Sequence, residues 1–264
     1  MDLRLKDKKA LITGSTAGIG YGIARQLLKE GAQVIINGRT EERINSAINQ
    51  LQNSIPGCNV SGCVADFSNK QQIDQLIAEH DSVDILVNNV GIFAPKPFEK
   101  ITDDEWMHFF EVNVLSGVRL SRHYLPKMIN KDWGRIIFIS SESGVQIPSE
   151  MIHYGTTKTA QLGVARGLAQ QTSGTNITVN SVIPGSTMSE GAEKFITDLA
   201  KEKGKTSEEI EREFFETVRP TCLIKRFATI EEVATFVTYL VSPLAAANNG
   251  AALRVDGGTI PTIL

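Results

Sequence analysis

Short apolar runs alternate along the chain with longer stretches in which apolar residues recur every three or four positions. An apolar run that ends at glycine or a small polar residue is typical of a strand covered on both faces. Seven runs have this character: residues 9–13, 33–37, 59–64, 83–87, 134–139, 176–182 and 252–258. They predict an α/β protein with one Rossmann-type, doubly wound parallel sheet of about seven strands and helices on both faces.

The stretches between these runs have the 3.6-residue period of amphipathic helices. Helices are predicted around residues 23–28, at 41–53, at 70–79, from about 102 to 120, from about 154 to 172, and at 230–241. Residues 186–223 lack strand character and predict two charged helices, 192–202 and 207–218. No repeat or linker divides the chain, so we interpret residues 1–264 as a single domain with a helical insertion that closes over the substrate.

A glycine-rich turn joins the first predicted strand to the first helix. Strand, glycine turn and helix together place backbone N–H groups and a helix N-terminus against a phosphate. Only glycine lets the backbone approach a pyrophosphate closely. The residues predicted to contact a dinucleotide here are Gly14, Ser15, Thr16, Gly18, Ile19 and Gly20.

The end of the second predicted strand indicates which dinucleotide is bound. An acidic side chain usually holds a free ribose 2′-hydroxyl at this point, but the chain has Gly38 followed by Arg39. A guanidinium suits a 2′-phosphate and favours NADP(H) over NAD(H), which stays the alternative cofactor. Arg39 could instead pair with Glu41 or Glu42 on the surface.

Two further strand ends carry candidate cofactor contacts. Asp66 and Phe67 follow the third run, where Asp66 could accept from the adenine amino group or, like Ser68, could cap the next helix. The fourth run leads into residues whose amides tie loops together and whose glycine leaves room for a ligand: Asn89, Val90 and Gly91.

Tyr154 and Lys158 lie four residues apart at a predicted helix start, and therefore on one helical face. A fixed positive charge beside a phenol favours the phenolate and suits the phenol to proton transfer. Asn113 is an unfavourable residue inside a predicted helix, which indicates a partner for its side chain. His153 is expected on the surface or at an interface in preference to a substrate contact.

Composition narrows the class of protein further. Hydrophobic residues make up 41% of the chain, charged residues 22%, and the net charge is −3, which argues against nucleic acid as a partner. No apolar run approaches the roughly 18 residues of a membrane span. Cys58, Cys63 and Cys222 have no metal-site spacing, so we expect reduced thiols, no metal and a cytoplasmic location.

Taken in order, these motifs resemble the short-chain dehydrogenase/reductase family over almost the whole chain. The matching residues are Thr13, Gly14, Gly18, Gly20, Asn88, Asn89, Gly91, Asn113, Ser141, Tyr154, Lys158, Pro184 and Gly185. Val90 stands where the family has alanine.

The resemblance implies hydride transfer between a nicotinamide and a carbonyl or secondary alcohol. Tyr154 would exchange the proton, Ser141 would hydrogen-bond the same oxygen, and Lys158 would hold the ribose and lower the pKa of the tyrosine. Asn113 would position a water that links Lys158 to solvent. Pro184, Gly185 and Thr187 would lie beside the nicotinamide.

The substrate stays open at this stage. Residues 93–98, 144–151 and 186–223 would select it, and 3-oxoacyl thioesters are one alternative. A non-catalytic NADP-sensing module is another, although an intact proton relay argues against it. The resemblance also implies a homotetramer or homodimer built on helices around residues 104–131 and 154–172.

Overall fold

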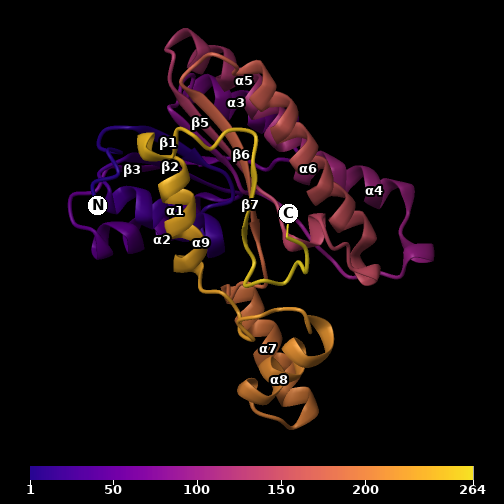
Figure 1. Cartoon of the computed structure of the whole chain (residues 1–264). Coiled ribbons are helices and arrows are strands. Elements are labelled where there is room, and N and C mark those ends of the chain that lie inside the picture. Colours follow the sequence, from indigo (N-terminus) through magenta and orange to yellow (C-terminus); the bar gives the residue numbers. More distant parts are fainter. Residues whose placement is uncertain (264) are drawn as a thin grey trace.

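The computed structural model describes residues 1–263. Seven parallel strands form one open sheet in the order β3-β2-β1-β4-β5-β6-β7 (Figure 1). The strands are β1 Lys9–Ile12, β2 Gln33–Gly38, β3 Val60–Val64, β4 Ile85–Asn88, β5 Gly134–Ile139, β6 Ile177–Pro184 and β7 Ala252–Val255. The predicted Rossmann-type sheet is therefore confirmed. The five inner strands are almost entirely buried because helices cover both faces, whereas the edge strands β3 and β7 are partly exposed.

The helices divide between the two faces of the sheet. They are α1 Gly18–Lys29, α2 Glu41–Ser54, α3 Lys70–Glu79, α4 Asp103–Phe110, α5 Ser116–Asn130, α6 Ile152–Gln171 and α9 Ile230–Leu240. Along β1, Ala10 and Ile12 pack in the core under α1, α2 and α9, whereas Leu11 packs in the core under α3, α5 and α6. This alternation of side chains along a strand gives the sheet two apolar cores.

The strand order reverses at β1, which lies between β2 and β4. Adjacent connections leave the sheet there in opposite directions and open a crevice at the carboxyl ends of the strands, where doubly wound proteins bind ligands. The glycine turn after β1 and residues 89–91 after β4 both lie at this end of the sheet.

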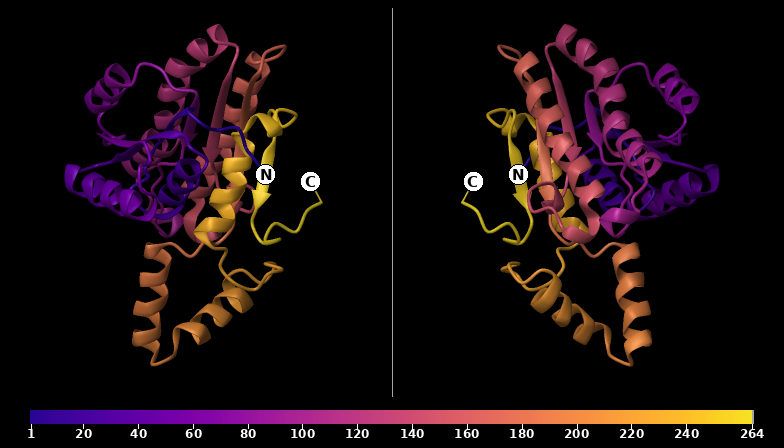
Figure 2. Two further views of the ribbon diagram at one scale, coloured as in Figure 1. Left: turned by 90° about the vertical axis from the view of Figure 1, so that its left-hand side faces the viewer. Right: turned by 90° about the vertical axis from the view of Figure 1, so that its right-hand side faces the viewer.

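The predicted helical insertion follows β6 and stands apart from the sheet, in orange in both views of Figure 2. It consists of α7 Glu190–Lys203, α8 Ser207–Glu213 and a π-helical segment, Phe214–Val218. Gly204 ends α7 in the left-handed conformation at φ 63°, and Thr206 and Glu209 form a capping box that begins α8. A separate apolar cluster that includes Ile196, Ile210 and Phe215 holds the insertion together.

The helix expected from Thr102 to about residue 120 is interrupted. Thr102 and Glu105 form a capping box at its start, but α4 ends at Phe110 and a π-helical turn, Glu111–Leu115, separates it from α5. Asn113 lies in this turn. π-Turns inside helices are frequent at functional sites because they change which backbone groups have helical partners. None of the helices formed by residues 1–263 is long and apolar enough to cross a membrane.

Candidate active site

The glycine turn is tied to the loop after β4 by a set of short hydrogen bonds. The Thr13 hydroxyl accepts from the backbone N–H groups of Asn89 and Val90, each at 2.9 Å. The Asn89 side-chain amide donates to the carbonyls of Thr13 and Gly14, also at 2.9 Å. These bonds fix the two loops that border the crevice at the switch point of the sheet.

The turn also has the close packing that a dinucleotide-binding backbone needs. Gly14 and Gly18 have φ angles of +60° and +58°, which other residues rarely adopt. A Cβ atom on Gly20 would come within 2.5 Å of the Asn89 amide and 2.6 Å of the Gly14 carbonyl. With α1 beginning at Gly18, backbone N–H groups at its N-terminus are available to a phosphate. The turn therefore fits a dinucleotide.

The predicted contacts around this turn differ in what their side chains can reach. Ser15 is fully buried, and its hydroxyl donates to the Ile12 carbonyl at 2.7 Å and accepts from the Asn37 N–H. Its backbone N–H donates to the Asn37 carbonyl at 2.9 Å, so Ser15 serves to fix the turn. Phe67 is likewise in the core, at 2% exposure. Thr16 and Ile19 are half-buried at the mouth of the turn.

Arg39 is exposed immediately after β2, and no ion pair joins it to Glu41 or Glu42 among the residues that the structure describes. Asp66 lies close enough for electrostatic interaction. Hydrogen bonds from Ser68 chiefly lower the pKa of the Asp66 carboxyl, and the charge of Arg39 lowers it further. The alternative that Asp66 or Ser68 caps α3 was wrong, because Asn69 accepts from the first N–H groups of that helix.

Tyr154 and Lys158 lie in the first two turns of α6, as their spacing predicted, with the Lys158 ammonium 5.8 Å from the centre of the tyrosine ring. The ammonium donates to the Ile139 carbonyl at 2.9 Å and to the Gln161 side-chain oxygen at 3.3 Å. A Cβ atom on Gly91 would meet the Lys158 nitrogen at 3.3 Å. The lysine is therefore held at the edge of the crevice.

Burial dominates the protonation of both groups. It raises the pKa of the Tyr154 phenol, and a hydrogen bond with the Ser141 side chain opposes that effect. Burial also lowers the pKa of Lys158 to about 8. The net direction for Tyr154 is opposite to the lowered pKa that was expected, although Lys158 stays largely protonated at neutral pH.

Ser141 follows β5 and is connected to the helical insertion through a residue that the sequence did not single out. Its hydroxyl donates to one carboxylate oxygen of Glu142 at 2.7 Å and accepts from the Ser143 N–H at 3.1 Å. The other carboxylate oxygen of Glu142 accepts from Nε of Arg219 at 3.2 Å. Both charged side chains are largely buried, at 8% and 13% exposure.

Asn113 has all of its polar groups engaged by protein. Its side chain exchanges hydrogen bonds with the backbone of Ile92 and donates to the Thr157 hydroxyl at 2.9 Å. Its main-chain carbonyl accepts from the Gln161 side-chain amide at 2.5 Å. The Gln161 side chain therefore joins the Asn113 main chain to the Lys158 ammonium. The sequence could have identified Gln161 as a partner of Lys158, because it follows Lys158 by three residues and therefore lies on the same helical face.

His153 was expected on the surface or at an interface, and the surface placement was wrong. Its side chain is 1% exposed and its ring centre lies 4.0 Å from that of Phe109 and 6.0 Å from that of Trp106. The packing of α4 against α6 covers the side of the helix on which His153 projects.

A cavity of about 470 Å³ opens beside Tyr154. Its wall includes six of the residues predicted from the sequence: Ile19, Ser141, Tyr154, Pro184, Gly185 and Thr187. The Thr187 hydroxyl donates to the Gly185 carbonyl at 3.0 Å. The phenol of Tyr154 and the hydroxyl of Ser141 thus lie on one cavity wall with Ile19 of the glycine turn, and the Lys158 ammonium lies 5.8 Å from the centre of the tyrosine ring.

This fold and this site define a nucleotide-dependent oxidoreductase of the Rossmann type. Residues 8–200 match the family model described as short chain dehydrogenase. The chain therefore belongs to the short-chain dehydrogenase family, whose members are oxidoreductases of the C=O/CH–OH pair.

Three comparisons show how similar its relatives are. The "uncharacterized oxidoreductase YvaG" of Bacillus subtilis is 48% identical over 263 residues, with 100% of both chains covered. The 3-oxoacyl-[acyl-carrier-protein] reductase FabG of Aquifex aeolicus is 34% identical over 263 residues, with 98% of this chain and 99% of the relative covered. The crystal structure of L-sorbose reductase from Gluconobacter frateurii, complexed with NADPH and L-sorbose, superposes with a TM-score of 0.94 at 31% identity, with 100% of both chains covered.

Proposed function

We propose that the protein is an NADP(H)-dependent oxidoreductase that transfers hydride between the nicotinamide and a carbonyl or secondary alcohol. The observation that carries this proposal is the convergence of Ser141 and Tyr154 on one cavity wall, with Lys158 behind them. The glycine turn borders the same crevice. The bound cofactor would supply the hydride.

The protein would supply proton transfer and electrostatic stabilisation. Tyr154 would give its proton to the substrate oxygen, or take it in the reverse direction. Ser141 would donate to the same oxygen and stabilise charge that develops there. Lys158, with a pKa of about 8, carries a positive charge at neutral pH and would hold the ribose hydroxyls beside the phenol.

A tyrosine exchange tests the proton-transfer role. Tyr154→Phe should lower kcat by at least about a hundredfold, the usual contribution of a general acid, while NADPH binding changes little. Tyr239→Phe, on α9 and partly exposed, is the matched control and should behave as wild type. The measurement is NADPH oxidation with ketones, diketones, quinones and a 3-oxoacyl thioester. A residual rate in Tyr154→Phe above a tenth of wild type would exclude this role.

The preference for NADP(H) rests on Arg39 and the glycine before it. A Cβ atom on Gly38 would lie 2.6 Å from a Thr16 side-chain carbon, so no acidic side chain fits there without rearrangement. The similar L-sorbose reductase was crystallised with NADPH. Arg39→Ala should weaken NADPH binding at least tenfold and leave NADH binding unchanged. Arg43→Ala, exposed on α2, is the control, and equal losses for NADPH and NADH would contradict the assignment.

Two alternatives have distinct results in the same assay. Selective turnover of the 3-oxoacyl thioester would favour the activity for which the Aquifex relative is named. Tight NADPH binding without turnover of any carbonyl would favour a nucleotide-sensing module.

A further inference from the structure

A second cavity, also of about 470 Å³, adjoins the one beside Tyr154. The two cavities share four lining residues: Phe93, Met151, Phe195 and Arg219. Phe93 also packs edge-on against the Tyr154 ring, with ring centres 6.0 Å apart. The second cavity, which we call the apolar chamber, therefore borders the cavity beside Tyr154.

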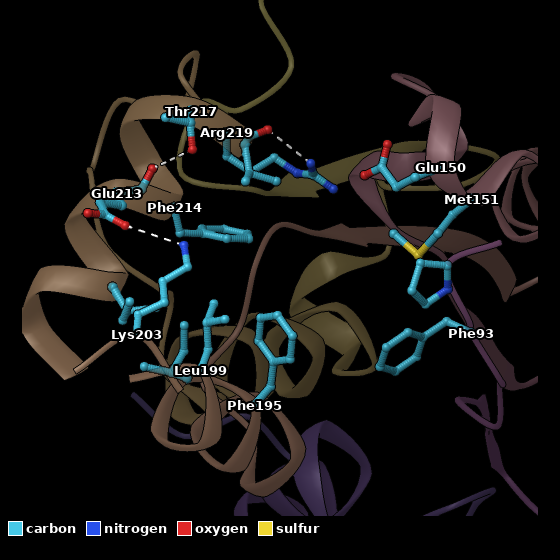
Figure 3. Close-up of a pocket in the computed structure, with 14 residues that line it drawn as sticks. Phe93, Glu150, Met151, Phe195, Leu199, Lys203, Glu213, Phe214, Thr217 and Arg219 are labelled. Atoms are coloured by element: carbon cyan, nitrogen blue, oxygen red, sulfur yellow. Dashed lines mark hydrogen bonds and ion pairs between the residues drawn. The ribbon is translucent and has the colours of Figure 1, made fainter. Parts of the chain in front are cut away.

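The apolar chamber is built by the helical insertion on one side and by the loop at residues 93–95 and the short 3-10 helix Ser149–Met151 on the other (Figure 3). Phe195 and Leu199 of α7 and Phe214 of the π-helical segment point into it, opposite Phe93 and Met151. Phe195 is 58% exposed and Phe93 is 71% exposed. Apolar surface of this extent at the entrance of a cavity is typical of a ligand site.

Three of the four charged side chains that line the apolar chamber are paired. Arg219 is bonded to Glu142, and the Lys203 ammonium lies 3.7 Å from a carboxylate oxygen of Glu213. The fourth, Glu150, is exposed and negatively charged. An anionic ligand group in this chamber would therefore lose water without gaining an available counter-ion. The chamber selects against anionic and heavily hydroxylated groups.

We propose that the apolar chamber binds an uncharged alkyl or aryl group of the substrate while the substrate carbonyl lies beside Tyr154 and Ser141. The substrate class is thus a ketone, or the corresponding secondary alcohol, with an apolar group extending several bonds from the reacting carbon. This inference rests on the proposed function and adds the substrate class to it. The insertion acts as the wall that buries the apolar group.

A homologous series of ketones tests the proposal. With NADPH saturating, kcat/KM should rise about fourfold for each methylene added from 2-butanone to 2-octanone, as burial of methylene groups predicts. L-Sorbose, a polar ketone, should be a far poorer substrate than 2-octanone. A flat or falling series, or a preference for L-sorbose, would overturn the proposal.

A pair of variants assigns the effect to the apolar chamber. Phe195→Gln removes an apolar ring from the chamber on an exposed helical surface, and it should reduce the gain per methylene to about twofold or less. Leu244→Gln also replaces an exposed apolar side chain, at a residue that is 39% exposed and outside the chamber, and it should leave the series unchanged. Equal slopes for wild type and Phe195→Gln would contradict the proposal.

The design separates failure of this inference from failure of the proposed function. Turnover of ketones without dependence on chain length leaves the oxidoreductase intact and removes the chamber as a substrate site. If no ketone is turned over, calorimetric titration of the NADP-loaded protein with 2-octanone and 2-butanone still decides the inference. At least tenfold tighter binding of 2-octanone, lost in Phe195→Gln, supports it, and equal binding refutes it.

Discussion

The ion pair between Arg219 and Glu142 joins the helical insertion to the residue that follows Ser141, and its removal has a calculable cost. Arg219→Met would leave the Glu142 carboxylate buried, with the Ser141 hydroxyl as its hydrogen-bond partner. Glu142→Gln leaves the guanidinium a remaining bond to the Val218 carbonyl at 3.0 Å. We therefore expect the arginine exchange to be the more damaging of the two.

The magnitude follows from burial and geometry. Breaking a buried pair by removing one partner usually costs about 3–5 kcal/mol. The Arg219 side chain is 13% exposed, the Glu142 side chain is 8% exposed, and one contact of 3.2 Å joins Nε of Arg219 to a carboxylate oxygen of Glu142. The lower part of that range therefore applies. Arg219→Met should reduce the free energy of unfolding by about 3 kcal/mol, Glu142→Gln by about 1 kcal/mol, and the double variant by about 2 kcal/mol less than their sum.

Urea unfolding of the four proteins measures this coupling, and kcat/KM for a ketone substrate measures its effect on the site. Arg25→Met is the matched control, because Arg25 and Glu231 form a pair at 3.0 Å in which both side chains are exposed. That exposed pair should contribute at most about 1 kcal/mol. The reasoning fails if Arg219→Met costs no more than Arg25→Met, or if the two exchanges at the buried pair are additive.

Two further predictions concern Lys158. The pKa of Lys158 falls from 10.5 to about 8 on folding, so the unfolded chain binds more protons than the folded chain between these pH values. The free energy of unfolding should therefore rise by about 2 kcal/mol more from pH 8 to pH 10 in the wild type than in Lys158→Met. Parallel unfolding curves for the two proteins over this range would contradict it. Gln161→Leu removes an acceptor from the ammonium and a donor from the Asn113 carbonyl, so stability should fall by about 2 kcal/mol and the pKa of Lys158 should fall further. The pH dependence of unfolding measures both effects, with exposed Gln171→Leu as the control, which should show neither effect.

The strands were predictable because a strand that is buried on both faces consists of consecutive apolar residues. Gly134–Ile139 has the predicted bounds, whereas the sixth strand continues to Pro184 because Ile183 and Pro184 still pair with β7. The π-turn at Glu111–Leu115 was not predictable from periodicity. In a π-turn the backbone hydrogen bonds join residues five apart instead of four, and this change leaves the spacing of apolar residues along α4 and α5 nearly unchanged.

Within the site, local contacts were predictable and long-range contacts were not. Tyr154 and Lys158 share a helical face whatever the rest of the chain does. By contrast, Arg219 and Glu142 are 77 residues apart and Gln161 and Asn113 are 48 apart, so only the folded chain brings them together. His153 shows the same limit, because helical geometry gives the direction of a side chain but not what packs on that side.

The single proton of the Ser141 hydroxyl links the insertion to the chemistry. In the structure that proton is donated to Glu142, but the proposed reaction needs it on the substrate oxygen. The Glu142 carboxylate divides its two oxygens between the Ser141 hydroxyl and Nε of Arg219. Because Arg219 comes directly after the π-helical segment that lines the apolar chamber, one ion pair connects the insertion to the carboxylate that holds this proton.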